Sequence, residues 1–524
     1  MYLQTLAVLA GLCLTVNTMA NNPKKVTDSE VKTVNLRVIQ TSDVHGSFFP
    51  YDFINRRPRK GSLARVSTYV NQLRQTYGKN LILLDNGDIL QGQPTCYYCN
   101  YVKPDIENVA AKVINYLGYD AQTVGNHDIE TGHAVYDKWI GEVNCPMLGA
   151  NIIDTKTGRP YVHPYTIIER EGVKVAVVGM LTPAIPNWLH DELWSGLRFD
   201  EMVECARYWV DYLKKNEHPD IIIGLFHSGY LGGISTPEYE EDATLHVAME
   251  VPGFDLIVFG HDHTSHHDVI RNLAGEEVVL LDPSSNAYNV CDANIQLKVK
   301  DGKVIYKQVS GQLVSVADMP VDEAYMKFFQ ADIDSVNNYV NRRIGRFEAP
   351  VYVRDSYFGN SAFCDLIHNL QLQITGADIS FNAPLTFDTV IREGDVFVSD
   401  MFNLYKYENQ IYVMLLTGEE IRRHLEMSYD LWVNTMHSPD DHIMLLADTE
   451  SDDNQRFFFK NLAFNFDSAA GIDYEVDVTK PDGEKVRILQ MSNGEPFDPQ
   501  KTYRVAMNSY RGNGGGELLT KGAG

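Results

Sequence analysis

The sequence predicts an α/β fold built on parallel strands, because short apolar runs alternate with amphipathic segments. Such runs recur through the first half of the chain, and segments of helical periodicity such as 63–77 separate them. Alternation of this kind is typical of βαβ units. Ligands bind outside the carboxyl ends of parallel strands, so we expect these ends to meet at one edge of one sheet. The predicted strands cover 36–39, 81–84, 121–124, 221–226 and 256–259.

Each of these predicted strands is followed by side chains that bind metal ions. Imidazole together with carboxylate and amide oxygen suits zinc, manganese or iron better than calcium or magnesium alone. An aspartate between two sites can bridge two cations, and two cations can clamp a phosphoryl group. The ordered set therefore predicts a catalytic centre with two divalent metal ions. Its stretches are Asp43-Val44-His45-Gly46, Gly87-Asp88, Gly125-Asn126-His127-Asp128, His227-Ser228-Gly229 and Gly260-His261-Asp262-His263.

The length of 524 residues favours two domains over one compact core. We expect a first domain at 35–312, which holds every metal-type motif, and a second domain at 350–524. A linker at 313–349 should be dominated by one long helix over 321–344, whose apolar residues form a stripe. The last residues read as the middle of an element, so we expect a truncated C-terminus.

The composition is that of a soluble globular protein, with 44% apolar and 22% charged residues. The formal net charge of −25 repels nucleic-acid polymers and gives no polybasic membrane signal. We therefore expect a small-molecule substrate, no nucleic-acid polymer as partner and no stable membrane insertion. A phosphate substrate would need local positive charge, which two metal ions would supply; otherwise the acidity serves solubility alone. Nothing in the sequence indicates an oligomeric state.

The N-terminus predicts export. An apolar run from Leu6 to Val16 is followed by small and polar residues up to Ala20, which is typical of a secretory signal peptide over residues 1–20. The protein is then periplasmic or extracellular. In an exported protein, Cys96-Tyr97-Tyr98-Cys99 favours a loop disulfide over a zinc site or a redox role.

Taken with these motifs, residues from about 35 to 524 resemble the 5′-nucleotidase and 2′,3′-cyclic-nucleotide 2′-phosphodiesterase family. The strand-end motifs are similar to those of calcineurin-like metallophosphoesterases. The resemblance implies a metallophosphoesterase α/β/β/α sandwich followed by an α+β nucleotidase C-terminal domain. Markers of the latter are Thr375-Gly376-Ala377-Asp378, Arg392-Glu393-Gly394-Asp395, Leu416-Thr417-Gly418-Glu419 and Asn508-Ser509-Tyr510-Arg511-Gly512-Asn513-Gly514-Gly515.

The resemblance also implies roles for single residues. His127 would act on the leaving group, with Glu130 as its orienting partner, and Asn126 would contact substrate as well as metal. The nucleobase would stack between Tyr407 and Tyr510 and accept or donate a hydrogen bond at Asn409. One metal ion would be held by Asp43, His45, Asp88 and His263, and the other by Asp88, Asn126, His227 and His261.

Two departures from the family bear on the substrate. The family has an aspartate where Glu130 stands, and phosphate-side arginines where Asn360 and Asp388 stand. We therefore predict hydrolysis of 2′,3′-cyclic nucleotides and 3′-nucleotides. A 5′-nucleotidase, a UDP-sugar hydrolase or a phosphoprotein phosphatase are alternatives with the same fold. A non-enzymatic exported binding protein and a metal-stabilised structural module are alternatives of other classes.

Overall fold

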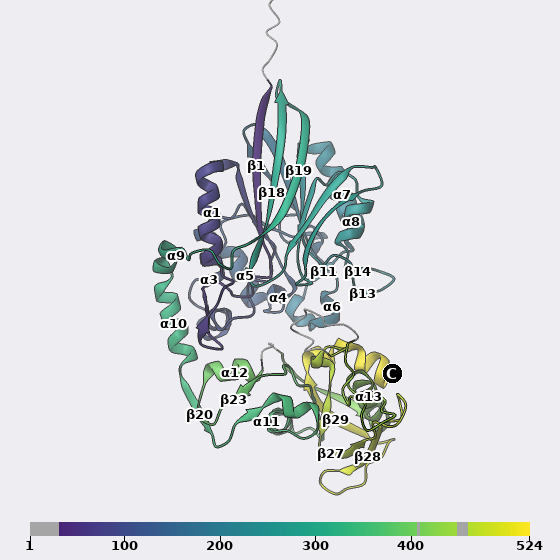
Figure 1. Ribbon diagram of the computed structural model, residues 1–524. Helices are drawn as coiled ribbons and strands as arrows, with labels where there is room; N and C mark the ends of the chain where they lie inside the picture. Colours follow the sequence, from purple (N-terminus) through teal and green to yellow (C-terminus); the bar gives the residue numbers. More distant parts are fainter. Residues whose placement is uncertain (1–30, 406–408, 448–458) are drawn as a thin grey trace, which may run out of the picture.

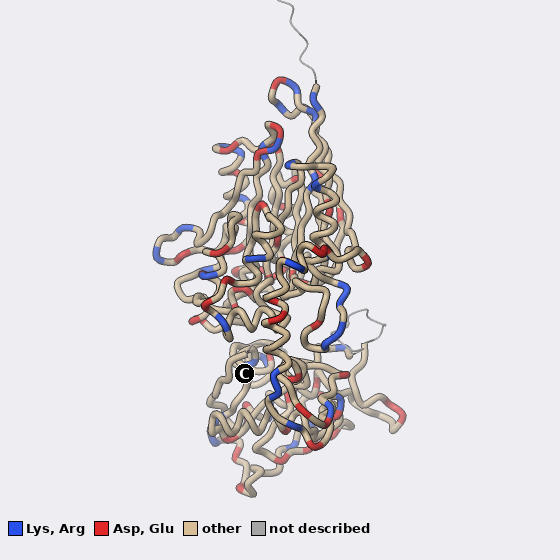
Figure 2. Tube along the Cα trace, turned by 90° about the vertical axis from the view of Figure 1, so that its left-hand side faces the viewer, with Lys and Arg blue, Asp and Glu red and all other residues tan. Residues whose placement is uncertain are grey.

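The computed structural model describes residues 31–405, 409–447 and 459–524. Figure 1 shows two bodies, one above the other: an N-terminal domain coloured purple to teal, and a C-terminal domain coloured green to yellow. The predicted signal peptide at 1–20 lies outside the described residues. Basic and acidic residues are interspersed along both domains (Figure 2).

The N-terminal domain consists of two large sheets, several short strands and the helices that cover them. Its longer helices are α1 (Leu63–Tyr77), α3 (Val109–Leu117), α5 (His133–Glu142), α7 (Met202–Asn216) and α8 (Thr244–Glu250); the shorter ones are α2 (Pro94–Tyr97), α4 (Asn126–Ile129) and α6 (Ile185–Trp188). Its strands are β1 (Lys32–Thr41), β2 (Tyr51–Asp52), β3 (Arg57–Pro58), β4 (Leu81–Asp85), β5 (Ala121–Thr123), β6 (Met147–Leu148), β7 (Ile152–Asp154), β8 (Arg159–Pro160), β9 (Tyr165–Arg170), β10 (Val173–Leu181), β11 (Leu197–Phe199), β12 (Ile221–His227), β13 (Gly232–Ser235), β14 (Glu240–Asp242), β15 (Leu256–Phe259), β16 (Ser265–Arg271), β17 (Glu277–Pro283), β18 (Asn289–Lys300) and β19 (Lys303–Ser315).

The five predicted strands are divided between two six-stranded sheets. One sheet has the order β19-β18-β1-β4-β5-β6, and the other has the order β16-β17-β15-β12-β10-β9. Strands β1, β4 and β5 run parallel in the first, and β12 and β15 run parallel in the second. The expectation of one sheet is therefore wrong, because apolar runs report burial and not which strand is the neighbour.

The two sheets pack face to face around a common apolar core. Val38 and Ile82 of the first sheet share this core with Ile223 and Val258 of the second, and all four are at most 1% exposed. Helices α1 and α3 pack on the outer face of the first sheet, and α7 and α8 on that of the second (Figure 1). This is the predicted α/β/β/α sandwich.

Two helices, α9 (Glu323–Phe328) and α10 (Gln330–Val340), replace the single helix predicted over 321–344. The chain bends at Phe329, which is fully buried against Tyr325 in the core of the N-terminal domain. The apolar stripe of the predicted linker is thus covered by the first domain, except at Phe328, which is 56% exposed. The domain limits at 312 and 349 stay a prediction, although β19 runs past the first of them.

The C-terminal domain places a four-stranded sheet, in the order β25-β29-β22-β26, beside the helices α11 and α13. Its core gathers Phe381, Trp432, Phe466 and Tyr503. The helices are α11 (Ala362–Thr375), α12 (Val398–Leu404), α13 (Gly418–Trp432) and α14 (Ser509–Gly512). The strands are β20 (Arg343–Phe347), β21 (Val351–Tyr352), β22 (Ile379–Asn382), β23 (Val390–Ile391), β24 (Gly394–Phe397), β25 (Ile411–Thr417), β26 (Ser468–Ala470), β27 (Ile472–Val476), β28 (Val486–Met491) and β29 (Thr502–Asn508).

Cys96 and Cys99 are buried and are not joined by a disulfide, so the predicted loop disulfide is wrong. Cys96 lies in α2, and its thiol donates to the carbonyl of Ile89 at 3.3 Å. The segment is helical and packed, where the sequence suggested an open loop. Among the described residues, no helix is both long enough and apolar enough to cross a membrane.

Candidate metal centre

The predicted metal ligands lie close together at the ends of the two sheets that face the C-terminal domain (Figure 1). Each sits at the carboxyl end of a strand, as expected from βαβ geometry. Asp43 and His45 follow β1, Asp88 follows β4, Asn126 begins α4 after β5, His227 ends β12, and His261 and His263 follow β15.

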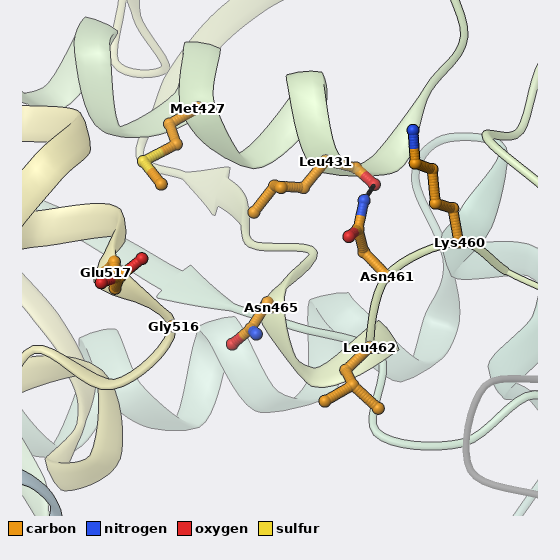
Figure 3. A pocket seen from close by; sticks show the side chains of 8 residues that line it. All are labelled: Met427, Leu431, Lys460, Asn461, Leu462, Asn465, Gly516 and Glu517. Atoms are coloured by element: carbon orange, nitrogen blue, oxygen red, sulfur yellow. Dashed lines mark hydrogen bonds between the residues drawn. The ribbon is translucent and has the colours of Figure 1, made fainter. Parts of the chain in front are cut away.

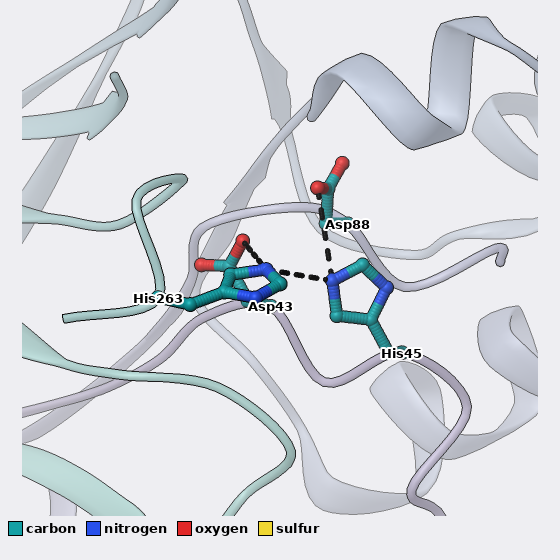
Figure 4. Close-up of side chains that lie close together, drawn as sticks. All are labelled: Asp43, His45, Asp88 and His263. Carbon is teal, nitrogen blue, oxygen red and sulfur yellow. Dashed lines mark hydrogen bonds and ion pairs between the residues drawn. The ribbon is translucent and has the colours of Figure 1, made fainter. Parts of the chain in front are cut away.

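The first group consists of Asp43, His45, Asp88 and His263, whose ligand atoms all lie within 4.8 Å of one another (Figure 4). The Nε2 atoms of His45 and His263 are 3.0 Å apart. Nε2 of His263 lies 3.3 Å from Oδ1 of Asp43. Nε2 of His45 lies 3.9 Å from Oδ2 of Asp88. Two carboxylates and two imidazoles thus face one point.

The second group forms around the side-chain oxygen of Asn126. This Oδ1 lies 3.0 Å from Nε2 of His227 and 2.8 Å from Nδ1 of His261. Nε2 of His227 is also 3.3 Å from Oδ2 of Asp88, the oxygen that faces His45 in the first group. The Asp88 carboxylate therefore belongs to both groups.

The donor set fits two divalent cations. Oδ1 of Asp43 and Oδ2 of Asp88 are buried and accept no regular hydrogen bond among the described residues. A buried carboxylate oxygen without a partner is costly, and a metal ion removes that cost. Ligands of a tetrahedral zinc, at ~2.0–2.2 Å from the metal, lie roughly 3.3–3.6 Å apart. The separations between Asp43, Asp88 and their facing imidazoles are of this size.

The backbone is strained at most of the metal-facing residues. The φ angle is positive at Asp43 (50°), His45 (47°), Asp88 (52°), His261 (89°) and His263 (57°). Such a conformation costs about 1–3 kcal/mol per non-glycine residue and persists where the surroundings impose it. The sequence carries no signal of this strained backbone conformation, which points the side chains toward the two groups.

Asp128 is a residue whose role the sequence did not reveal. Its buried carboxylate accepts the backbone N–H groups of Asp88, Ile89 and Leu90, each at 2.9 Å, and that of Gly125 at 2.8 Å. Burial and the nearby Asp88 charge raise the pKa of Asp128 to about 6. Asp128 joins the loop of Asp88 to the loop of Asn126. Its place in the Gly-Asn-His-Asp stretch was visible, but its partners are backbone groups that no motif shows.

The structure brings His127 and Glu130 together. Nδ1 of His127 lies 2.5 Å from Oε2 of Glu130, and the His127 backbone N–H donates to Oδ1 of Asp88 at 2.8 Å. The His127 ring lies edge-on to His45, with ring centroids 5.4 Å apart. Burial lowers the pKa of His127, but the Asp88 and Glu130 carboxylates outweigh it and raise the pKa to about 10. The catalytic role of this pair stays a prediction.

Of the predicted base-binding residues, Tyr407 lies outside the described residues. Asn409 and Tyr510 lie near each other, because Ser509 donates its hydroxyl to Oδ1 of Asn409 at 3.3 Å. The same turn reaches the N-terminal domain through Asn513, whose Nδ2 donates to the carbonyl of Trp188 at 3.2 Å.

Trp188 in turn lies beside the second group, since the centroid of its ring is 5.6 Å from that of the His261 ring. Thus a single residue, Trp188, lies between the turn at α14 and the second group. A cavity of about 260 Å³ opens beside it, lined by Met427, Leu431, Lys460, Asn461, Leu462, Asn465, Gly516 and Glu517 (Figure 3). Asn465 in this lining accepts from the Tyr510 hydroxyl at 3.4 Å.

A two-sheet sandwich with a metal-type centre at its strand ends defines a metal-dependent phosphoester hydrolase, and comparison with known families agrees. Residues 36–265 match the family model of the calcineurin-like phosphoesterases. Residues 343–521 match that of the 5′-nucleotidase C-terminal domain. The chain thus joins a calcineurin-like phosphoesterase domain to a 5′-nucleotidase C-terminal domain, which confirms the resemblance seen in its motifs.

Relatives are similar over nearly the whole chain. The 2′,3′-cyclic-nucleotide 2′-phosphodiesterase/3′-nucleotidase of Yersinia enterocolitica is 26% identical, over 97% of this chain and 83% of its own length. The protein of the same name from Salmonella typhimurium is 26% identical, over 92% of this chain and 82% of its own. A 5′-nucleotidase of Vibrio cholerae is 33% identical, but over 44% of this chain and 40% of its own.

Solved structures share the fold across both domains. A putative 5′-nucleotidase from Staphylococcus aureus superposes with a TM-score of 0.75 at 22% identity, over 93% of this chain and 92% of that one. A 5′-nucleotidase precursor from Thermus thermophilus gives a TM-score of 0.64 at 21% identity, over the same shares. These likenesses establish the two-domain architecture.

Proposed function

We propose that the chain is a phosphohydrolase of small nucleotides with two metal ions, acting on 2′,3′-cyclic nucleotides and 3′-nucleotides. The observation that carries this proposal is the Asp88 carboxylate, whose Oδ2 faces His45 of one group and His227 of the other. A shared carboxylate is what a pair of adjacent cations requires. The names of the Yersinia and Salmonella relatives support the substrate class.

The residues divide into two ligand sets that share Asp88. Zinc and manganese suit the mixture of imidazole, carboxylate and amide oxygen. When bound, the two ions supply positive charge against the phosphate and lower the pKa of a water for in-line attack. One set is Asp43, His45, Asp88 and His263, and the other is Asp88, Asn126, His227 and His261.

His127 is proposed to protonate the leaving oxygen of the sugar. Glu130 accepts the hydrogen on Nδ1, which orients the ring and leaves Nε2 to carry the transferred proton. The proton moves from Nε2 to the leaving oxygen, which departs as a hydroxyl group. The carboxylates of Asp88 and Glu130 favour the protonated ring, as an acid catalyst needs.

The C-terminal domain is proposed to hold the nucleobase. Tyr510, with Tyr407, would stack on the base, and Asn409 would hydrogen-bond to its edge. The contact of Asn513 with Trp188 supports this proposal, because it sets the turn that carries Tyr510 next to the metal centre. Base stacking tolerates any base, so broad nucleotide specificity is expected.

The choice of phosphate follows from charge. A dianionic 5′-monophosphate gains from arginines beyond the metal ions, because Arg–phosphate pairs are bidentate and charge-assisted. At the two positions where the family has phosphate-side arginines, this chain has Asn360 and Asp388, and neither side chain carries a positive charge. A 2′,3′-cyclic phosphodiester carries one negative charge and can be served by the metal ions alone. The Vibrio 5′-nucleotidase, similar over 44% of this chain, favours a 5′-nucleotidase as the second candidate. A UDP-sugar hydrolase is a third.

The test is a comparison of kcat/KM for 2′,3′-cyclic AMP, 3′-AMP and 5′-AMP with Zn²⁺ or Mn²⁺ added. We expect the first two to be preferred. A tenfold preference for 5′-AMP would instead establish the 5′-nucleotidase alternative. We also propose that the protein acts outside the cytoplasm, on the strength of the apolar run from Leu6 to Val16. N-terminal sequencing of the exported protein checks the cut after Ala20.

A further inference from the structure

Imidazoles that bind metal ions need a second partner to fix which ring nitrogen carries the hydrogen. Two histidines of the centre find that partner in neutral oxygens. Nδ1 of His227 donates to the backbone carbonyl of Asn86 at 2.7 Å. Nδ1 of His45 lies 3.2 Å from the backbone carbonyl oxygen of Gln91 and 3.2 Å from its Oε1.

His261 is held differently. Its Nδ1 faces the metal side, 2.8 Å from Oδ1 of Asn126, while its Nε2 lies 3.1 Å from Oε1 of Glu241. Glu241 is the one carboxylate among these second partners in the described part of the chain. It comes from the hairpin of β13 and β14, which lies between the predicted motifs.

The Glu241 carboxylate is fixed in place and only 15% exposed. Its Oε2 accepts the backbone N–H of Ile234 at 2.6 Å, across the hairpin. Its backbone carbonyl accepts the hydroxyl of Ser228 at 2.8 Å, next to His227. Gly233, with φ of +68°, leaves room for it, because a Cβ there would come within 2.5 Å of Oε2. The hairpin is therefore shaped around this carboxylate.

The neighbouring acid, Asp242, is engaged elsewhere. Its Oδ1 accepts the backbone N–H of Gly229 at 2.8 Å and lies 3.9 Å from Nε2 of His261. Glu240, on the other side, lies 3.2 Å from His246 and is 41% exposed. Of these three acids, only Glu241 has a carboxylate oxygen within hydrogen-bond distance of Nε2 of His261.

We propose that Glu241 is a positioning residue of the metal centre. It accepts the Nε2–H of His261, so the lone pair of Nδ1 stays on the metal side. A carboxylate partner also makes the imidazole a stronger electron-pair donor to the metal ion than a neutral carbonyl partner does. The second metal position, which His261 shares with Asn126 and His227, therefore depends on the β13–β14 hairpin. The inference rests on the proposed function in taking His261 as a ligand.

The experiment titrates metal-free protein with Zn²⁺ against a chromophoric chelator, which resolves the two binding steps without any activity measurement. The variants are Glu241→Gln, His261→Gln, the double variant, and Glu240→Gln as the matched control on the same strand. We expect Glu241→Gln to weaken one step by about 10- to 100-fold and to leave the other unchanged. His261→Gln should weaken the same step more. The double variant should bind as His261→Gln does.

Each outcome separates the two proposals. If His261→Gln weakens one step and Glu241→Gln weakens neither, the role of Glu241 is wrong and the metal centre stands. Equal losses in Glu241→Gln and Glu240→Gln would also overturn that role. If His261→Gln leaves both steps intact, the ligand assignment itself fails. Melting temperatures of the metal-free variants control for folding, and those of Glu241→Gln and Glu240→Gln should agree.

Discussion

The carboxylate of Asp128 accepts the backbone N–H of Asp88 at 2.9 Å and thereby holds the shared metal-facing residue from behind. Asp88 has a positive φ of 52°, a strained conformation that needs such support. Because Asp128 also accepts three further backbone N–H groups, it joins two loops that come from different strands of the same sheet.

Asp128→Asn should therefore destabilise the protein and loosen the metal centre. One side-chain oxygen becomes an NH₂ group, which opposes backbone N–H donors, and a buried unsatisfied donor costs about 1–3 kcal/mol. We expect a lower urea midpoint and less bound metal. The exposed Asp318→Asn is the control, and equal midpoints for the two variants would contradict this role.

His127→Ala should lose activity while it keeps its metal ions. Removal of a positioned acid typically costs ~10²–10⁴ in rate. Glu130→Gln should fall between the wild type and His127→Ala, because it leaves the ring but changes its partner. His246→Ala, a half-exposed histidine of the same domain, controls for the substitution. Loss of metal with unchanged turnover per bound metal would show that His127 is a ligand instead.

Tyr510→Ala should raise KM for nucleotides and leave KM for p-nitrophenyl phosphate unchanged. Stacking on an aromatic ring is worth ~1–3 kcal/mol per base, and p-nitrophenyl phosphate has no base to stack. Tyr352→Ala, at a tyrosine that is 42% exposed in the same domain, is the control. Equal KM changes for both substrates would mean that Tyr510 serves the fold alone.

The stability of the C-terminal domain should depend on Asp467 in acid. Burial would raise the pKa of Asp467, but Arg511, at 2.7 and 3.0 Å, and a hydrogen bond from His424 lower it to about 2. Because the folded pKa lies below the unfolded value of 3.8, the ionised form stabilises the fold above pH 4. That contribution, about 2 kcal/mol, is lost as the pH falls from 4 through 2.

Urea unfolding of the wild type and of Asp467→Asn at pH 7, 4 and 2.5 measures this effect. The difference in unfolding free energy between the two proteins should shrink as the pH falls. A difference that stays constant from pH 7 to 2.5 would refute the assignment.

The local elements were predictable from the sequence, because each depends on neighbours in the chain. The helix over 63–77 and the strand over 256–259 have the predicted bounds. The division of β1 and β12 between two sheets was not predictable from periodicity, since β12 is buried along its whole length and β1 is buried on both faces over 38–41. The arrangement in two sheets followed only from the family resemblance.

The metal-facing residues were visible because their types and their places after strands are local features. Glu241 was not, since it lies in a hairpin of ordinary composition and acts only through its contact with His261. The strain at His45 and Asp88 also left no trace, because any residue type can stand at a positive φ when its surroundings impose it.

Metal analysis of Asp88→Ala beside the wild type tests the central claim most directly. The claim is that one carboxylate serves two cations, since Oδ2 of Asp88 faces both His45 and His227. After loading with Zn²⁺ and gel filtration, the wild type should carry two metal ions per chain. The variant should lose at least one of them, together with nucleotide hydrolysis. Two metal ions and full activity in Asp88→Ala would contradict the account.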